Sequence, residues 1–281
     1  MKIIRSISSM KKCIKNERKK GPKIGFVPTM GYLHQGHISL AQQSVKECDV
    51  TVMSVYVNPT QFGLHEDYKK YPRDIKSDAA LAKEAGVDYL FVPSDSDMYP
   101  LGFSSKVIVS NVTQMLCGAS RPGHFDGVTT IVSKLFNIIE PNTVFFGQKD
   151  AQQIIVIKKM VKDLNIQLKI KALPIVRDSD GLAMSSRNAY LSKAQRLEAL
   201  SLYQALQKAK ELIGQGECNS AKIIASMKRL ILRGKSVRID YIAIVDAEDL
   251  SFKKHIKAKV LIAIAVFIGK VRLIDNLIIK V

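Results

Sequence analysis

The sequence lacks the features that mark membrane proteins and exported, disulfide-bonded proteins. Its longest apolar run, Val260–Ile268, is bounded by Lys259 and Lys270 and falls far short of the roughly 20 residues that span a bilayer. Lys11 and Lys12 interrupt the start of the chain, where a signal peptide needs an unbroken apolar stretch. The four cysteines lie far apart and form no CxxC pair. We therefore expect a cytoplasmic protein with free thiols, without a cleavable leader, a zinc site or a membrane contact.

Acidic residues are scarce, and this gives the chain its one unusual total. It has 25 Asp and Glu residues against 43 Lys and Arg residues, a formal net charge of +18. Such a charge is compatible with a nucleic-acid partner, and also with attraction of anionic substrates such as ATP. However, the lysines are spread from Lys2 to Lys280, and no basic region alternates with aromatic residues as single-strand binders require. We predict no nucleic-acid partner, and a salt-dependent gel shift would contradict this prediction.

Residues 24–176 alternate short apolar runs with longer segments of helical periodicity. Strands are expected at 23–27, 50–57, 89–92 and 144–146, and helices at 36–47, 74–85, 127–139 and 151–164. This alternation predicts an α/β fold with a parallel sheet covered by helices on both faces. Ligands of such sheets bind beyond the carboxyl ends of the strands. The polar motifs of this chain fall at those positions.

The pattern changes after about residue 176, so we predict one domain at 1–176 and a smaller α+β domain at 177–281. Ser192 and Gln195 form a capping box at the start of a helix that ends at Gly214. A second helix is expected at 220–232. Three strand-like runs follow at 237–245, 260–268 and 271–279, and the Gly269-Lys270 pair between the last two predicts a tight antiparallel hairpin.

The first motif that carries chemistry is the segment 28–37, which contains His34-Gln35-Gly36-His37 and runs from the first strand into a helix. Two histidines three residues apart can turn both imidazoles toward a phosphate chain. Gly36 permits close approach of a nucleotide, and the helix N-terminus adds a partial positive charge. The alternative is that both histidines are ordinary polar residues at a helix entry. No G-x-x-x-x-G-K-[ST] sequence is present, so ATP would not be held by a P-loop.

A second motif, Gly147-Gln148-Lys149-Asp150, follows the buried run 144–146. The glycine permits close approach, Lys149 can meet a phosphate, and Asp150 can accept hydrogen bonds from ribose hydroxyls. A strand-to-helix turn in which Asp150 is an N-cap explains the same residues equally well.

A third motif, Met184-Ser185-Ser186-Arg187, lies where the pattern changes. Two hydroxyls beside an arginine form a compact set of donors for a polyphosphate. Together with the histidine motif, it resembles the paired HIGH and KMSKS signatures of class I nucleotidyl-transfer enzymes. Both elements would stabilise the charge that builds on the α-phosphate and on departing pyrophosphate when a carboxylate attacks ATP.

Uncharged amides form a fourth group. Gln61 follows Asn58 after the second strand, and Gln152 and Gln153 follow Asp150. Glutamines that meet at one edge of the sheet suit a neutral, hydroxyl-bearing organic acid. From the sequence they could equally be solvated amides.

Taken together, these segments closely resemble the pantothenate synthetase family, the pantoate–β-alanine ligases. The matching segments are VPTMGYLHQGH (27–37), VYVNPTQF (55–62), DYKKYPRD (67–74), GASRPGHFDGVTTIVSKLFNII (118–139), FFGQKDAQQ (145–153), PIVRDSDGLAMSSRN (174–188) and RLIDN (272–276). They occur in family order over nearly the whole chain. The resemblance implies a Rossmann-like N-terminal domain, a C-terminal lid domain and a homodimer.

The resemblance also implies a two-step reaction with Mg²⁺-bound ATP as co-substrate and no organic cofactor. Pantoate would attack the α-phosphate to give pantoyl adenylate and pyrophosphate, and β-alanine would then displace AMP to give pantothenate. Metal ligands are not identified. The expected catalytic residues are His34, His37, Lys149 and Arg187. The expected ATP site comprises Met30, Gly31, Tyr32, Leu33, His34, Gln35, Gly36, His37, Gly147, Gln148, Lys149, Asp150, Val176, Met184, Ser185, Ser186 and Arg187.

By the same resemblance, Gln61 would hold pantoate and β-alanine, and Gln153 would hold pantoate. We expect His37 to act as a cationic hydrogen-bond donor to phosphate, without transferring a proton, because pyrophosphate bound to magnesium needs little protonation. Gln148 and Ala151 stand where an acidic and an aromatic residue are common in the family, which bears on affinity. A tRNA synthetase-like protein or a nucleotidyltransferase acting on a phosphorylated substrate are the alternatives within nucleotide chemistry.

Overall fold

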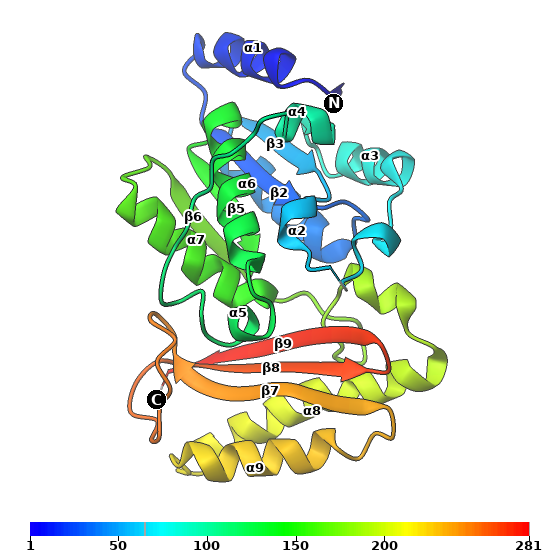
Figure 1. Ribbon diagram of the computed structural model, residues 1–281, viewed down its shortest axis with the longest axis vertical. Helices are drawn as coiled ribbons and strands as arrows, with labels where there is room; N and C mark the ends of the chain where they lie inside the picture. The colour runs from blue at the N-terminus through cyan, green and yellow to red at the C-terminus, as the bar shows by residue number, and fades with distance from the viewer. Residues whose placement is uncertain (65, 281) are drawn as a thin grey trace.

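The computed structural model describes residues 1–64 and 66–280, which form two β-sheets with their covering helices (Figure 1). The larger sheet is six-stranded and parallel, in the order β1-β4-β3-β2-β5-β6. Its strands are β1 (Lys2–Ile4), β2 (Ile24–Thr29), β3 (Val50–Val55), β4 (Tyr89–Phe91), β5 (Thr143–Gly147) and β6 (Lys169–Leu173). The strand order reverses at β2, which lies between β3 and β5. The carboxyl ends of β2 and β5 therefore border the crevice where ligands of such sheets bind.

Helices cover both faces of this sheet. They are α1 (Ile7–Arg18), α2 (Gln35–Glu47), α3 (Ile75–Glu84), α4 (Asp95–Met98), α5 (Cys117–Ser120), α6 (His124–Ile139) and α7 (Ala151–Asp163), with short 3-10 turns η1 (Pro59–Gln61), η2 (Tyr68–Lys70) and η3 (Gln148–Asp150). Adjacent residues on one strand belong to opposite cores. Phe146 packs in the core that contains α1, α6 and α7, whereas Phe145 packs in the core that contains α2 and α3. This two-sided burial explains why the strands read as continuous apolar runs.

The second sheet is antiparallel, in the order β7-β8-β9, with η4 (Ser186–Tyr190) before it in the chain and two helices against it (Figure 1). Its elements are α8 (Lys193–Gly214), α9 (Ser220–Ile231), β7 (Val237–Asp246), β8 (Val260–Ile268) and β9 (Val271–Ile279). The hairpin between β8 and β9 turns at Gly269-Lys270, and Gly269 has a positive φ of 57°. The capping box of Ser192 and Gln195 is present at the start of α8.

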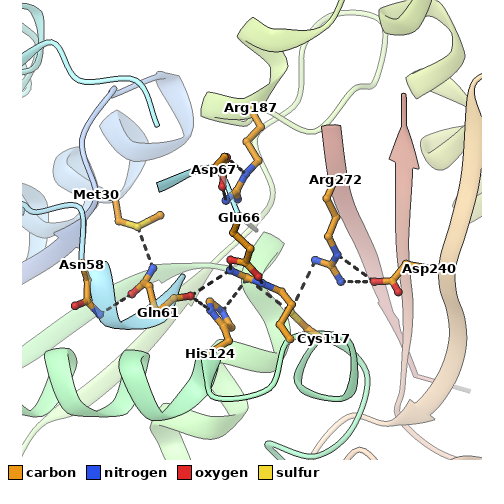
Figure 2. Close-up of polar contacts among 11 residues, drawn as sticks. Met30, Asn58, Gln61, Glu66, Asp67, Cys117, His124, Arg187, Asp240 and Arg272 are labelled. Carbon is orange, nitrogen blue, oxygen red and sulfur yellow. Dashed lines mark hydrogen bonds and ion pairs between the residues drawn. The ribbon is translucent and has the colours of Figure 1, made fainter. Parts of the chain in front are cut away.

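Strand β8 is buried on both sides, which explains why it is the longest apolar run of the chain. Ile262 and Ile264 pack with α8 and α9, while Leu261 and Ala263 belong to the core of the first sheet. Polar contacts join the same two parts. Arg272 on β9 pairs with Asp240 on β7, with N–O distances of 2.7 and 3.0 Å, and its Nη1 lies 3.8 Å from the Cys117 sulfur on α5 (Figure 2). The two sheets therefore share one packed interior.

The predicted fold class is confirmed: a parallel sheet with helices on both faces and a smaller α+β unit. The boundary after residue 176 stays a prediction, and Val281 of the predicted second domain lies outside the described residues. Strands β1 and β6, helix α1 and the short elements of the first unit, such as α4 and α5, were not predicted. Strand β1 has only three residues, and α1 and β6 carry lysines that interrupt their apolar periodicity. Within residues 1–64 and 66–280, no helix is long and apolar enough to cross a membrane.

Candidate active site

A cavity of about 170 Å³ lies at the carboxyl ends of β2, β3 and β5, where the strand order reverses. It brings together residues from segments far apart in the chain. The residues predicted from the sequence that line it are Met30, His34, His37, Gln61, Lys149, Asp150, Gln153, Ser185, Ser186 and Arg187. The other predicted ATP-site residues lie outside this lining: Gly31, Tyr32, Leu33, Gln35, Gly36, Gly147, Gln148, Val176 and Met184. All but Val176 lie close in the chain to lining residues, and Val176 accepts a backbone hydrogen bond from Met184, 3.0 Å away.

The two histidines of the first motif cap α2 with their own side chains. His34 is the N-cap, and its Nδ1 accepts from the backbone N–H of Gly36 at 3.1 Å. The Nδ1 of His37 accepts from the backbone N–H of His34 at 3.3 Å. Both interpretations of the histidines are thus compatible with the structure: polar residues at a helix entry, and residues that bind a phosphate chain. Because Nδ1 is an acceptor in each ring, the neutral imidazole carries its proton on Nε2. Each histidine is left with one N–H donor at the cavity.

Burial keeps both imidazoles neutral. Desolvation is the main cause that lowers the pKa of His34 to about 4, and the positive charge of Lys149 adds to it. Burial also lowers the pKa of His37 well below its usual value, with further contributions from His34 and Lys149. The lowered pKa therefore favours a neutral His37 over the cationic state that we expected. His37 can still donate a hydrogen bond to phosphate, because its neutral tautomer carries a hydrogen on Nε2.

Gly36 serves the histidine pair in a way that the sequence does not indicate. A Cβ at this position would lie 2.8 Å from Cε1 of His34. We expected this glycine to make room for a nucleotide, but here it makes room for the capping imidazole. The preceding turn has a similar constraint at Gly31, where φ is 85° and a Cβ would come within 2.7 Å of Val55.

Asp78 on α3 holds that turn from behind and was not predicted. Its carboxylate, which is 2 % exposed, accepts from the backbone N–H groups of Tyr32 at 3.0 Å and Leu33 at 2.7 Å. Burial raises the pKa of Asp78, although these hydrogen bonds favour its charged form. An aspartate on the same helix face as the buried Ala82 is the signal that could have identified it.

The second motif forms η3, which is anchored by the second sheet. The side chain of Asn276 on β9 donates to the carbonyl oxygens of Gln148 at 3.0 Å and Lys149 at 2.9 Å. Asp150 stands at the N-cap position of α7, but its side chain makes no capping hydrogen bond. The alternative interpretation is therefore confirmed for the position of Asp150 at the strand-to-helix turn, although its side chain does not cap the helix. Its carboxylate lies 3.5 Å from the Lys149 Nζ, and both side chains line the cavity.

The third motif reaches the cavity from the start of the second unit. Arg187 forms a two-pronged ion pair with Asp67, with both N–O distances at 2.8 Å (Figure 2). Burial opposes the charge of this arginine, but the hydrogen bonds and attraction of Asp67 raise its pKa above the usual value. Ser186 donates to the carbonyl oxygen of Tyr32 at 3.2 Å, which links this loop to the histidine turn. Arg187 is thus presented to the cavity by a carboxylate, a partner that the sequence did not indicate.

The glutamines divide into two kinds. Gln152 is buried and structural: its oxygen accepts from the N–H of Cys117 at 2.9 Å, and its amide group donates to the carbonyl oxygens of Val112 and Met115. Gln61 and Gln153 line the cavity. The structure therefore separates the neighbours Gln152 and Gln153, which face different ways because they are adjacent on α7.

Several residues that line the cavity were not predicted from the sequence. Tyr56 and Tyr71 contribute rings, and α6 contributes an apolar wall of Val128, Ile131, Val132 and Leu135. The wall residues belong to the helix expected at 127–139, but periodicity cannot tell which residues of a helix border a cavity. Within residues 1–64 and 66–280, no group of three or more His, Cys, Asp or Glu side chains is arranged to hold a metal ion.

Comparison with known proteins gives one consistent result. The family model described as Pantoate-beta-alanine ligase matches residues 2–278. The pantothenate synthetase of Caldicellulosiruptor bescii is 52 % identical over 280 residues, which covers 100 % of this chain and 99 % of that protein. The pantothenate synthetase of Caldicellulosiruptor saccharolyticus is 53 % identical over 281 residues, with 100 % of each chain covered.

Solved structures agree with the sequence matches. The crystal structure of pantothenate synthetase from Thermus thermophilus superposes with a TM-score of 0.94 at 42 % identity, and the match covers 99 % of each chain. The pantoate-beta-alanine ligase from Francisella tularensis, in complex with beta-gamma ATP and beta-alanine, has a TM-score of 0.81 at 36 % identity. That match covers 99 % of this chain and 97 % of the Francisella chain.

Proposed function

This chain belongs to the pantoate–β-alanine ligase family, and from that premise we propose how its own residues carry out the reaction. The chain is an ATP-dependent ligase that condenses pantoate with β-alanine to pantothenate, AMP and pyrophosphate. The observation that supports a site for this chemistry is the arrangement around the cavity. Two imidazole Nε2–H groups, the Lys149 ammonium and the Ser185–Arg187 loop meet where the parallel strand order reverses.

In the first step, a pantoate carboxylate oxygen bonds to the α-phosphorus of ATP, and the bond from that phosphorus to the bridging oxygen breaks. Pyrophosphate leaves with the electron pair, so negative charge grows on the leaving group. We propose that His34, His37 and Lys149 donate hydrogen bonds to these oxygens, and that Arg187 joins them. Donors fixed before the reaction need little reorganisation as the charge develops, which makes them effective at lowering the barrier.

In the second step, the β-alanine amine attacks the acyl carbon of pantoyl adenylate, and AMP leaves. The amine must be neutral to attack. As the amide forms, the bond from the acyl carbon to the AMP oxygen breaks with its electron pair on AMP, and one proton passes from the nitrogen to solvent. We propose that Gln61 and Gln153 orient the acyl group and that Gln61 also orients the amine. Their amides can donate and accept without adding charge, which suits hydroxyl and carbonyl groups.

Mg²⁺ is proposed to arrive on the ATP phosphates as part of the substrate. A magnesium ion in such sites is typically held by one or two carboxylates together with substrate phosphates and water. Asp150 fits that role, because its side chain is 46 % exposed and lines the cavity beside Lys149. The ion would neutralise the charge of the leaving pyrophosphate. No organic cofactor is needed for this balance of atoms.

A homodimer and a cytoplasmic location are also proposed. Light scattering of the purified protein should give twice the mass of 31.2 kDa, and a monomer at all concentrations would contradict the dimer. The cytoplasmic location is supported by four free cysteines, which fit a reducing compartment. Cell fractionation would test it.

The reaction is tested by measuring pyrophosphate and AMP with each substrate omitted in turn. With pantoate but without β-alanine, a single burst of pyrophosphate close to one per active site is expected, because the adenylate stays bound. Adding β-alanine should start steady turnover and release AMP. Equal turnover with unrelated acids, or no burst with pantoate, would contradict the proposed function.

A further inference from the structure

Gln61, which the proposed function places against both organic substrates, is held in its position from several sides. Its side-chain oxygen accepts from the Asn58 amide at 3.1 Å, and its amide nitrogen lies 2.9 Å from the sulfur of Met30. Its backbone carbonyl oxygen accepts from His124 Nδ1 at 2.7 Å (Figure 2). The same oxygen accepts from Arg121 Nη2 at 3.3 Å. Gln61 lines the cavity, whereas His124 and Arg121, which contact its carbonyl oxygen, do not.

The proton positions in this cluster follow from the chemistry of its members. A carbonyl oxygen only accepts, so Nδ1 of His124 must carry a hydrogen. A guanidinium only donates, so Nε2 of His124 must be the acceptor for Arg121 Nη1, 3.1 Å away. His124 is therefore fixed as the neutral Nδ1–H tautomer. Burial, followed by the charge of Arg121, lowers the pKa of His124 to about 4, in agreement with this assignment.

Arg121 is in turn fixed by Glu66. Its Nε donates to Glu66 Oε1 at 2.7 Å, and its Nη2 donates to the other carboxylate oxygen. The arginine side chain is only 14 % exposed and that of Glu66 25 %, so the pair is largely shielded from water. The contacts thus run from Glu66 through Arg121 and His124 to the backbone of Gln61.

The backbone around Gln61 also depends on close packing by the first turns of α6. A Cβ at Gly127 would lie 2.4 Å from the carbonyl oxygen of Thr60 and 2.6 Å from the nitrogen of Gln61. The Asn58 side chain, 1 % exposed, donates to the carbonyl oxygen of Gly127 at 3.1 Å. The start of α6 and η1 therefore form one unit, and His124 stands on the turn that touches Gln61.

Glu66, Arg121 and His124 do not line the cavity. From the proposed function and this geometry, we infer that the Glu66–Arg121–His124 cluster is a positioning device that sets the orientation of Gln61 toward pantoate and β-alanine. His124 acts through the Gln61 carbonyl and touches neither substrate. The cluster should therefore govern the affinity for the organic substrates and leave ATP binding, at the His34 side of the cavity, largely unchanged.

The test is a double-mutant cycle between His124 and Gln61. We expect His124→Ala to raise the KM for pantoate about tenfold, the effect of one broken hydrogen bond, with the KM for ATP within about twofold of wild type. In the Gln61→Ala background the same His124→Ala change should have little further effect on pantoate, because the residue it acts through is gone. Pantoate dissociation constants, measured calorimetrically with a non-hydrolysable ATP analogue present, give the cycle even where turnover is very slow.

Two further variants separate positioning from general support of the fold. His124→Asn places an N–H where Nδ1 stood and should recover most of the pantoate affinity, whereas His124→Gln places its N–H nearer the Nε2 position and should not. His255→Asn, at an exposed histidine, is the matched control and should leave every parameter unchanged.

Each outcome decides the inference. Losses of pantoate affinity that multiply in the double variant would overturn it, since His124 would then contact a substrate or act elsewhere. Equal recovery by His124→Asn and His124→Gln would also overturn it. Failure of the proposed function is seen separately, in wild-type protein: no pantoate-dependent pyrophosphate burst and no pantoate binding, in which case the inference falls with it.

Discussion

The cavity is bordered by two sets of phosphate donors that are held in different ways. His34 and His37 are fixed by hydrogen bonds within the first turn of their own helix, with partners two and three residues away. Arg187 is held by Asp67, which lies 120 residues away in the chain. This arrangement leaves the imidazole Nε2–H groups to meet a ligand, whereas Arg187 donates from Nε and Nη2 to Asp67 and keeps Nη1 for a phosphate. The histidines are therefore positioned by local contacts, and Arg187 is positioned by a contact between distant segments of the chain.

The largest expected effect comes from a change at the histidine pair. His37→Ala removes a fixed donor from the developing charge and should slow adenylation about 10²–10³-fold, the usual cost of one such donor. Pantoate binding should change little. Rapid-quench measurement of the pyrophosphate burst, with calorimetry for pantoate, separates the two quantities. Equal losses in rate and affinity would show that His37 does not act selectively in the transition state.

His37→Gln sharpens this prediction, since its amide can place an N–H near the former Nε2 position. It should recover part of the lost rate without any group that titrates near neutrality. A rate as low as that of His37→Ala would mean that hydrogen-bond donation alone does not explain the role of this residue.

A smaller effect is expected from changes at Arg187 and its partner Asp67. Arg187→Lys keeps the charge but loses the two-pronged geometry, and the KM for ATP should rise about tenfold. Asp67→Asn weakens the contact that positions Arg187, so the KM for ATP should rise several-fold and the melting temperature should fall. An unchanged KM for ATP in Asp67→Asn would mean that Arg187 does not need this contact to meet the phosphate.

The smallest expected effect on rate concerns pH. If the histidine donors act as neutral imidazoles, kcat/KM for ATP should vary by less than about twofold between pH 5.5 and 7.5 as far as these two groups are concerned. A rise in kcat/KM toward pH 5.5 that His37→Gln abolishes would instead identify a cationic donor.

The lowered pKa of His34 should also make the free energy of unfolding depend on pH. His34 has a folded-state pKa of about 4 and an ordinary value of 6.5. The unfolded chain therefore binds more protons between these values, and the free energy of unfolding falls as the pH drops from 6.5 toward 4. His34→Asn should reduce this slope in urea titrations at several pH values. An unchanged slope would contradict the lowered pKa.

Much of the fold could be predicted from the sequence because it depends on local sequence patterns. The period of the apolar residues, the Ser192 capping box and the Gly269-Lys270 turn each depend on neighbours in sequence. The motifs of the cavity were also identified, because the first two follow strand ends and the third lies where the pattern of the sequence changes. The capping role of the histidine pair was not, since histidine is not among the usual N-cap residues.

What the sequence could not indicate depends on long-range pairing. The partners of Arg187 and Arg121 are 120 and 55 residues away, and one chain contains many acidic residues that could serve equally well. The difference between Gln152 and Gln153 is similar: both are glutamines at a helix start, and only the packed structure shows that one of them is enclosed by the 112–117 loop. Local patterns locate the site, while the tertiary fold decides which of its polar groups remain available.

The double burial of β8 has a consequence for how the molecule comes apart. Leu261 and Ala263 sit in the interior of the first sheet, while their neighbours Ile262 and Ile264 sit against α8 and α9. Melting either part alone would expose one side of this strand to water, at a cost that rises with the apolar area uncovered. Heating should therefore produce a single calorimetric peak whose van't Hoff enthalpy matches the measured heat. Cooperativity between the two halves would then be a property of one shared strand.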